Sequence, residues 1–428
     1  MRKFLLAGVA TVAMTGVAAA SGLEPTLGSA SSGVIGTAQP GKAIVRLDGY
    51  VFFAAGIGSN SLDKAPNGAK ADSFGLLSTF RIYPSFDAQT PGGFRYGGFA
   101  EVRSNSNTGG VGGGVGTAGT RGTNTLFVNR AWGYVGTDQL GRLQFGTVDG
   151  VASQMRTGTF EGQIADGGWN GWAPGLTRGV NPYRFSVGGG YEYSAQKLNY
   201  MSPTWSGFQV GFAFAPSTAP NTAGDGNNVK DGGNTRQASS VAPGDLGRFR
   251  NMWQVGARYT GTFGGVGTQL HAGYIGSAAI KNANIGGVSP RGLSVFTAGA
   301  TVSYMGFMVG GYMNTGTVNS NMTPLAPGEK SSMVYTIGAS YTNGPWVVGA
   351  AYLNASQAGV VGNGAKRTDI GWTAGVTYTY VPGARLFVEL VTGTAKERGV
   401  NLSNDVLPAG STKAINATAV ILGNSFRW

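Results

Sequence analysis

The chain has 428 residues, including 76 glycines and no cysteine, with 12% charged residues and a formal net charge of +12. The lack of cysteine excludes a disulfide framework, and a mean hydropathy of −0.03 fits neither a bundle of apolar membrane helices nor an ordinary charged globule. A basic excess suits nucleic acid, acidic lipid or anionic solutes, but the arginines are scattered singly, and we expect no nucleic-acid partner.

The first residues carry the marks of an export signal. "MRK" supplies positive charge, "FLLAGVATVAMTGV" is a short apolar run, and "AAAS" offers small residues for cleavage. We therefore predict a signal peptide over 1–20, cut after Ala20. The competing interpretation, a membrane anchor, needs about 20 apolar residues, and the run is shorter. Residues 21–43 have no predicted role, and the folded domain is expected over 44–428.

Alternating side chains run through the rest of the chain. In "TDIGWTAGVTYTY", the even positions from Ile370 to Tyr380 are apolar or aromatic, whereas the odd positions are polar or glycine. Side chains of a strand point to opposite faces in turn, so such a strand has one apolar face and one polar face. The pattern predicts sixteen strands, near 44–57, 72–83, 93–103, 124–137, 140–148, 190–202, 206–215, 250–262, 265–276, 291–304, 306–315, 332–342, 345–354, 368–381, 384–394 and 415–427.

The connections between these strands alternate between long and short. Tight-turn dipeptides such as "NG" and "PG" close the short ones, and the longest connection covers about 149–189. With an even strand number, both chain ends lie on the side of the short turns. This arrangement favours an antiparallel up-and-down meander that joins its first strand to its last.

Closure removes both edges of a large sheet. A polar second face is unsuited to a dry core, whereas an apolar face toward lipid and a polar face toward water account for both periodicities. Short periplasmic turns and long extracellular loops are typical of outer-membrane barrels. We predict an all-β transmembrane barrel of about 16 strands in the outer membrane of a Gram-negative bacterium, in contact with its lipid. A secreted β-sandwich or β-helix adhesin is the alternative, and it leaves the loop alternation unexplained.

The motifs that suggest chemistry have simpler explanations. Gly114, Gly116 and Gly119 match GxGxxG, but no helix pattern or Gly-Lys-Ser/Thr follows, so we interpret the segment as an outer loop. His271 is the single histidine and is expected to face water, which leaves no partners for a metal site. A Ser-His-Asp hydrolase would need an activated serine beside it, and no serine stands out. We expect no enzyme activity, no cofactor and no metal.

Charged residues of the inner face carry the functional prediction. Taking the apolar face of each strand as outward, the inward set on the first three strands includes Arg46, Arg81, Arg95, Glu101 and Arg103. Arginines on adjacent strands share one wall, and arginine-lined pores favour anions.

The segment "NRAWGYVGTDQLGRLQFGTVDGV", together with "RLDGYVFFAAG", "YTYVPGARLFVELVTG" and the aromatic C-terminus, resembles the Gram-negative general porin family. The resemblance implies a trimer of sixteen-stranded barrels whose third long loop, 149–189, folds inward to form a constriction. In that family acidic loop residues face an arginine cluster on the opposite wall. The exact loop signature of the family is absent here, and the loop offers Glu161 and Asp166 for the acidic part, with Asp149 at its root. Arg130 matches the fourth-strand arginine, with Arg46, Arg81, Arg95 and Arg103 as the neighbouring basic wall.

The sequence thus predicts a pore for passive diffusion of small hydrophilic solutes and ions, with a mild preference for anions. A substrate-specific channel for sugars or acidic metabolites, with Trp169 and Trp172 as a sliding surface, is one alternative. A non-channel adhesive barrel is the other. Phe426 and Trp428, at the end of the last strand, are predicted to lie at the periplasmic interface, and by the resemblance to be the signal read by the barrel-assembly machinery.

Overall fold

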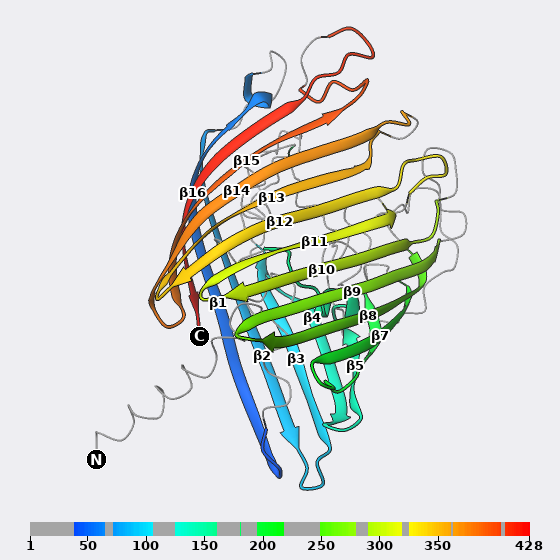
Figure 1. The fold of residues 1–428 in the computed structure, drawn as a ribbon, viewed down its shortest axis with the longest axis vertical. Helices are drawn as coiled ribbons and strands as arrows, with labels where there is room; N and C mark the ends of the chain where they lie inside the picture. Colours follow the sequence, from blue (N-terminus) through cyan, green and yellow to red (C-terminus); the bar gives the residue numbers. More distant parts are fainter. Residues whose placement is uncertain are drawn as a thin grey trace.

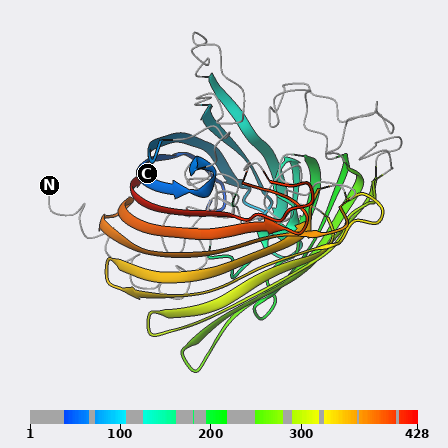
Figure 2. The same cartoon turned by 90° about the horizontal axis from the view of Figure 1, so that it is seen from above.

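The computed structural model describes residues 38–64, 72–105, 125–160, 180, 195–217, 249–279, 290–318, 325–360, 363–403 and 407–428. In these residues sixteen strands form one closed barrel (Figures 1 and 2). Every strand pairs antiparallel with its neighbours in the chain, and β1 pairs with β16. The predicted all-β up-and-down barrel of sixteen strands is confirmed.

The strands of the barrel are β1 Lys42–Asn60, β2 Phe74–Gln89, β3 Arg95–Asn105, β4 Thr125–Thr137, β5 Gly141–Thr147, β6 Gln196–Met201, β7 Phe208–Ser217, β8 Phe249–Phe263, β9 Val266–Ala279, β10 Ser294–Tyr304, β11 Phe307–Thr317, β12 Ser332–Asn343, β13 Trp346–Ala358, β14 Lys366–Val381, β15 Ala384–Glu397 and β16 Ile415–Arg427. A short 3₁₀ turn, η1 Ser61–Lys64, follows β1, and a single helical turn, α1 Val151–Gln154, follows β5. No helix in the described ranges has the length and apolar character needed to cross a membrane.

The outer face of the barrel is apolar, as the alternation requires. On β1 the outward Val45, Leu47 and Phe53 are exposed, whereas the inward Phe52 is fully buried. The same alternation continues on β16, where Val420 and Leu422 are exposed and Ile421 is buried. An apolar surface of this extent around a whole barrel matches the lipid-facing band of outer-membrane barrels.

The seam between β1 and β16 lies near both chain ends. Val51 is opposite Phe426 in the register, and the backbones of Gly49 and Trp428 exchange two hydrogen bonds of 3.1 and 3.3 Å. The Trp428 ring covers Gly49 so closely that a methyl group at residue 49 would overlap it. Glycine at this position therefore lets the terminal indole pack against the seam.

Aromatic pairs gather beside the short turns. Ring centroids of neighbouring strands lie 4.3–4.6 Å apart in three such pairs: Phe208–Tyr259, Phe307–Tyr341 and Trp346–Tyr378. Each pair stands at the turn-proximal end of its strands, where Trp and Tyr are stable at the boundary between lipid and water. Asn424 belongs to this zone as well, because its side chain hydrogen-bonds to the Tyr380 hydroxyl at 3.2 Å.

Several strand boundaries differ from the sequence prediction. β1 begins at Lys42 instead of 44, β2 continues through Pro84 to Gln89, and β6 begins only at Gln196. The predicted signal peptide over 1–20, and all of the 21–43 segment before Ala38, lie outside the described residues.

Candidate functional site

A β-bulge on β4 shapes the inner wall near the middle of the barrel. Val102 of β3 is opposite Val128 of β4, but the preceding Glu101 is opposite Arg130, so Asn129 is the extra residue. A bulge reverses the alternation of side chains along a strand. As a result Asn129 and Arg130 are both buried on the inner side, although they are adjacent in the chain.

Glu101 is the centre of a cluster on this wall. Its Oε1 accepts from Arg103 Nε at 2.6 Å and lies 3.4 Å from Arg81 Nη1. Its Oε2 accepts from Arg130 Nε at 2.7 Å and from Asn129 Nδ2 at 3.0 Å. One carboxylate thus gathers three guanidinium groups from β2, β3 and β4. Since Arg81 and Arg103 are directly opposite each other, and like charges in that position repel, Glu101 is what allows them to coexist.

Asp149 extends the cluster toward the connection after β5. Its Oδ2 accepts from Arg130 Nη1 at 2.6 Å, and its backbone carbonyl accepts from Asn199 Nδ2 at 2.7 Å. The side chains of Glu101, Arg130 and Asp149 are at most 2% exposed, whereas that of Arg103 is 19% exposed. The group holds three cations and two anions, and Arg103 presents the most accessible of the positive charges.

Only some of the arginines predicted to form one basic wall lie together. Arg81, Arg103 and Arg130 meet around Glu101, but Arg46 and Arg95 lie elsewhere. Arg46 is on the inner side of β1, opposite Ser85, and four residues from Tyr50, which is opposite Arg81. That spacing is about 14 Å along the strand.

Arg95 stands at the first residue of β3, beside the short turns. Its Nε pairs with Asp138 Oδ1 at 2.8 Å, and its Nη1 donates to the Ala38 carbonyl at 3.0 Å. Arg95 therefore ties the turn after β4 to the segment before β1 at the rim, which corrects its predicted place beside Arg81. Glu161 and Asp166, the predicted acidic partners on the loop, lie outside the described residues, and their role stays a prediction.

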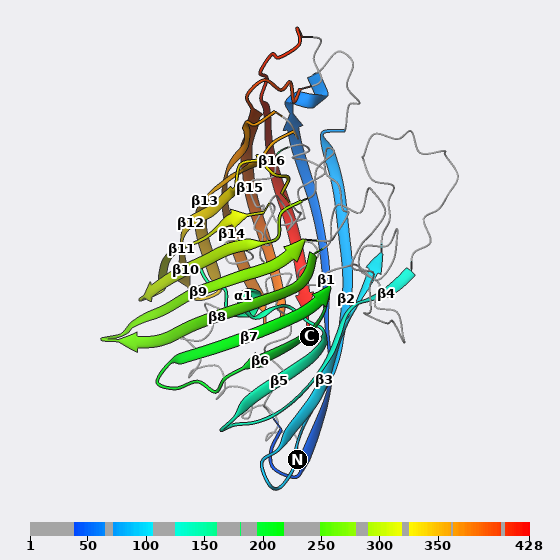
Figure 3. The same ribbon diagram turned by 90° about the vertical axis from the view of Figure 1, so that its right-hand side faces the viewer.

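The first part of the long connection after β5 lies inside the barrel (Figure 3). Val151 and Met155 of this segment are fully buried against the inner faces of β7 and β8. They fit there because the wall carries Gly211 and Gly256, which are opposite each other in the sheet. A Cβ on Gly211 would come within 3.0 Å of both Val151 and Met155, so the missing side chains make the space for the loop.

Hydrogen bonds fix the same segment to the wall. The Ala152 amide donates to Gln254 Oε1 at 3.2 Å, and Gln154 Nε2 donates to Gln144 Oε1 at 2.9 Å. Thr157 Oγ1 donates to Gln269 Oε1 at 3.1 Å. Polar residues that the alternation placed on the inner face thus hold the loop as well as lining the lumen.

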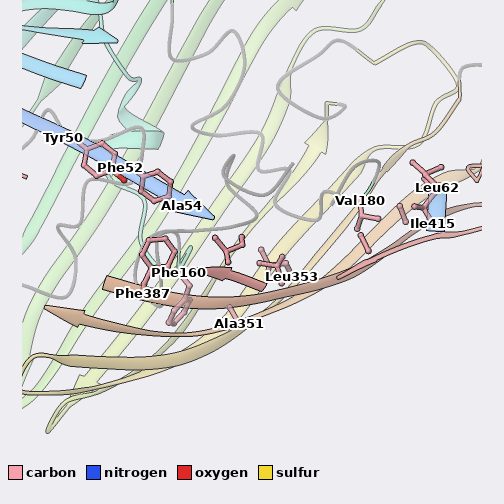
Figure 4. Packing of buried hydrophobic residues seen from close by; sticks show 14 of the residues in the cluster. Tyr50, Phe52, Ala54, Leu62, Phe160, Val180, Ala351, Leu353, Phe387 and Ile415 are labelled. Carbon is pink, nitrogen blue, oxygen red and sulfur yellow. The ribbon is translucent and has the colours of Figure 1, made fainter. Parts of the chain in front are cut away.

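Phe160 ends the described run of this loop and joins an apolar cluster. A Cβ on Gly338 of β12 would lie 2.8 Å from the Phe160 ring. The cluster also contains Tyr50 and Phe52 of β1 and Phe387 of β15 (Figure 4). The segment therefore runs from β5 along the inner wall to aromatic residues near the seam, and it reduces the open cross-section of the barrel.

His271 does not face open water, contrary to the sequence prediction. It is on the inner side of β9 but only 4% exposed. Its Nε2 hydrogen-bonds to Thr297 Oγ1 at 2.9 Å, and its ring stacks near Tyr312. In the part of the chain that the structure describes, no group of three or more His, Asp or Glu side chains could hold a metal ion.

The sequence predicted Glu101 only as an inward-facing residue and Asp149 only as the residue at the root of the long loop. Neither was predicted as a constriction residue, and Asn129 was missed. Asn129 could not be found from the sequence, because simple alternation assigns it to the outer face and only the bulge turns it inward.

Comparison with known proteins assigns the family. The family model described as Gram-negative porin matches residues 7–398. The chain belongs to the Gram-negative porins. It is accordingly an outer-membrane porin channel, as its closed barrel and apolar outer face already indicated. A search of curated proteins found no match.

Solved porin structures share its fold. An anion-selective porin from Comamonas acidovorans superposes with a TM-score of 0.56 at 15% identity, covering 90% of this chain and 100% of that one. OmpT of Vibrio cholerae, an outer membrane protein, is similar in a variant lacking loop L8, with a TM-score of 0.54 at 12% identity, covering 90% and 99%. The trimer form of OmpT gives 0.53 at 13% identity with the same coverage.

Proposed function

We propose that this porin is a water-filled pore through which small hydrophilic solutes and ions diffuse passively, with a mild preference for anions. The observation that carries the proposal is the Glu101 cluster, in which three arginines on the inner wall are balanced by two carboxylates. The net positive charge is exposed mainly through Arg103. Positive charge along a narrow lumen concentrates anions and depletes cations.

The inner face of the barrel and the inward loop together explain why hydrophilic solutes should be selected. Polar side chains and backbone line the lumen, so hydrated solutes keep hydrogen-bonding partners as they pass. The loop segment 148–160, held against β7 to β12, narrows the passage. We propose that Glu161 and Asp166 continue this loop opposite the arginines, so that charges of opposite sign face each other and orient water and dipolar solutes. No catalytic step is proposed.

The similar porin from Comamonas acidovorans is described as anion-selective, which agrees with the proposed preference for anions. At 15% identity this likeness concerns the fold, so the argument rests on the charges of this chain. The trimer form of OmpT supports a further proposal, that this porin assembles as a homotrimer in the outer membrane. Light scattering of the detergent-solubilised protein tests this; a monomeric mass would contradict the trimer and leave the pore proposal intact.

Planar-bilayer recording tests the pore itself. We expect discrete conductance steps, and in a KCl gradient a reversal potential of the sign that indicates anion preference. Clear cation selectivity would contradict the anion preference, and the absence of steps would contradict a pore. A conductance blocked in a saturable way by one sugar or acidic metabolite would instead support a substrate-specific channel.

A further inference from the structure

Two arginines lie on the inner face of the barrel away from the Glu101 cluster, nearer the short turns. Arg142 is the second residue of β5, directly after a short turn, and Arg258 is in the turn-proximal half of β8. In the sheet, Arg142 is opposite Gly136 on one side and Met201 on the other. Gly136 is six residues along β4 from Arg130, so the two cationic sites are about 20 Å apart along the wall.

Neither of these arginines is balanced by a carboxylate in the described part of the chain. Arg258 Nη2 donates to Gln209 Oε1 at 2.8 Å, which is an uncharged partner. Arg142 Nε is shut off from solvent without a hydrogen-bond partner among the described residues. Arg142, Met201, Gly211 and Gly256 lie in line across four neighbouring strands, and Arg258 is two residues from Gly256 on the same inner face. The charge of Arg258 acts on the Arg142 guanidinium group. Buried donors are normally satisfied, so this pair lacks an acceptor that carries negative charge.

The surroundings strengthen the electrostatic effect of the pair. Met201 is next to Arg142 in the sheet, and Met155 of the inward loop packs against Met201 over Gly211. These buried apolar groups close the wall on the loop side of the pair. Low polarity on one side lowers the local dielectric constant and raises the attraction for an ion that arrives from the lumen.

We propose that Arg142 and Arg258, with Gln209 holding Arg258, form a binding station for small multivalent oxyanions beside the short-turn mouth of the pore. Guanidinium groups present paired N–H donors that match phosphate and carboxylate oxygens. An oxyanion that accepts hydrogen bonds from both guanidinium groups would supply the missing negative charge and offset the repulsion between like charges. This proposal rests on the proposed function, because the station needs an open pore. Small oxyanions would then be the solutes that the pore retains longest.

Inorganic phosphate is the probe for this station. Single channels would be recorded in dilute KCl while phosphate is added to one side at a time. Wild-type channels should show phosphate block of the chloride current, stronger from the side of the short turns. In the double variant Arg142→Gln/Arg258→Gln, half-block should need about tenfold more phosphate, because charge-assisted hydrogen bonds are lost.

A double variant with Lys396→Gln and Arg398→Gln is the matched control. It also removes two positive charges, but from the end of β15 and the loop that follows, far from the short turns, and it should keep the wild-type block. Arg142→Lys, which keeps the charge but loses the planar fork, should be intermediate, and it carries the comparison if the double variant does not assemble.

Each outcome is decisive. Equal phosphate block in the wild type and the Arg142/Arg258 variant, or no block in the wild type, would overturn the station while the pore proposal stands. Absence of any conductance in the wild type would instead contradict the proposed function itself.

Discussion

Replacing Glu101 by glutamine tests the charge arrangement of the pore. Glutamine keeps the size of the side chain and two polar ends, but it removes the one negative charge that Arg81, Arg103 and Arg130 share. The cluster then holds three cations against Asp149 alone, so its net charge rises by one unit. Two consequences follow, one for the ions in the lumen and one for the stability of the wall.

The effect on ions can be worked from Coulomb's law. One unit charge at about 6 Å changes the energy of an ion by about 0.7 kcal/mol in water. Screening at 0.1 M salt reduces this to about 0.4 kcal/mol. Anions gain this energy and cations lose it, so the ratio of anion to cation permeability should rise about three- to fourfold.

The same substitution should lower the stability of the barrel. Glu101 is fully buried and meets three guanidinium groups. Removing one partner from a buried ion cluster costs about 3–5 kcal/mol because the remaining charges are left uncompensated. We therefore expect the folded Glu101→Gln barrel to unfold at lower temperature than the wild type.

Reversal potentials in a KCl gradient and the temperature at which the refolded barrel loses its β circular dichroism measure the two effects. Arg130→Ala is the complementary variant: it removes one cation, so it should reduce the anion preference or widen the pore. Glu101→Gln with unchanged selectivity would refute the assignment of this cluster to the conducting path. If the variant loses stability but keeps its selectivity, the Glu101 cluster has a structural role only.

Three further predictions concern the loop and the seam. Gly338→Ala should displace the Phe160 ring and change the single-channel conductance, whereas Gly92→Ala, where the new Cβ meets only Thr90 at 4.0 Å, should leave it unchanged. Gly49→Ala should push the terminal indole off the seam and lower barrel stability by about 1–3 kcal/mol, as measured by thermal unfolding. Deletion of Phe426–Trp428 should block assembly, and normal surface-exposed barrels from that deletion would disprove the signal role.

Most of the fold could be predicted from the chain because one physical rule repeats along it. Each strand must show one face to lipid and one to water, so the alternation is strong and marks nearly every strand. The boundaries fail where other effects act. Pro84 suggests a strand end, but β2 continues through it, because proline is tolerated where its missing N–H is not needed by a neighbouring strand.

The site was less predictable because it depends on departures from alternation. Arg95 has the same inward parity as Arg103, yet it bonds to Asp138 at the rim. Parity gives the face of a residue but not its height or its partner. The bulge at Asn129 changes the parity itself, and nothing in "FVNRAW" distinguishes it from a regular strand.

The glycines of the inner face have a different role from those of the turns, because they make space for the loop. Gly211 and Gly256 are adjacent in the sheet, and Gly338 lies farther along the same wall; together they leave room for a loop that must lie inside the barrel. In a chain read by itself they look like weak strand positions, because glycine disfavours a strand interior. In the barrel they are positions where the loop packs directly against the wall.

A mild anion preference is what the central cluster can produce at moderate cost. Three arginines alone on one wall would repel one another, and a buried unpaired charge is strongly unfavourable. Glu101 and Asp149 remove that penalty and fix the guanidinium groups in place, but they also cancel most of the positive charge. One net charge remains, exposed mainly through Arg103. The same residues that make the wall stable therefore limit how selective this cluster can be, and any stronger retention of anions falls to arginines such as Arg142 and Arg258 that have no carboxylate partner in the described chain.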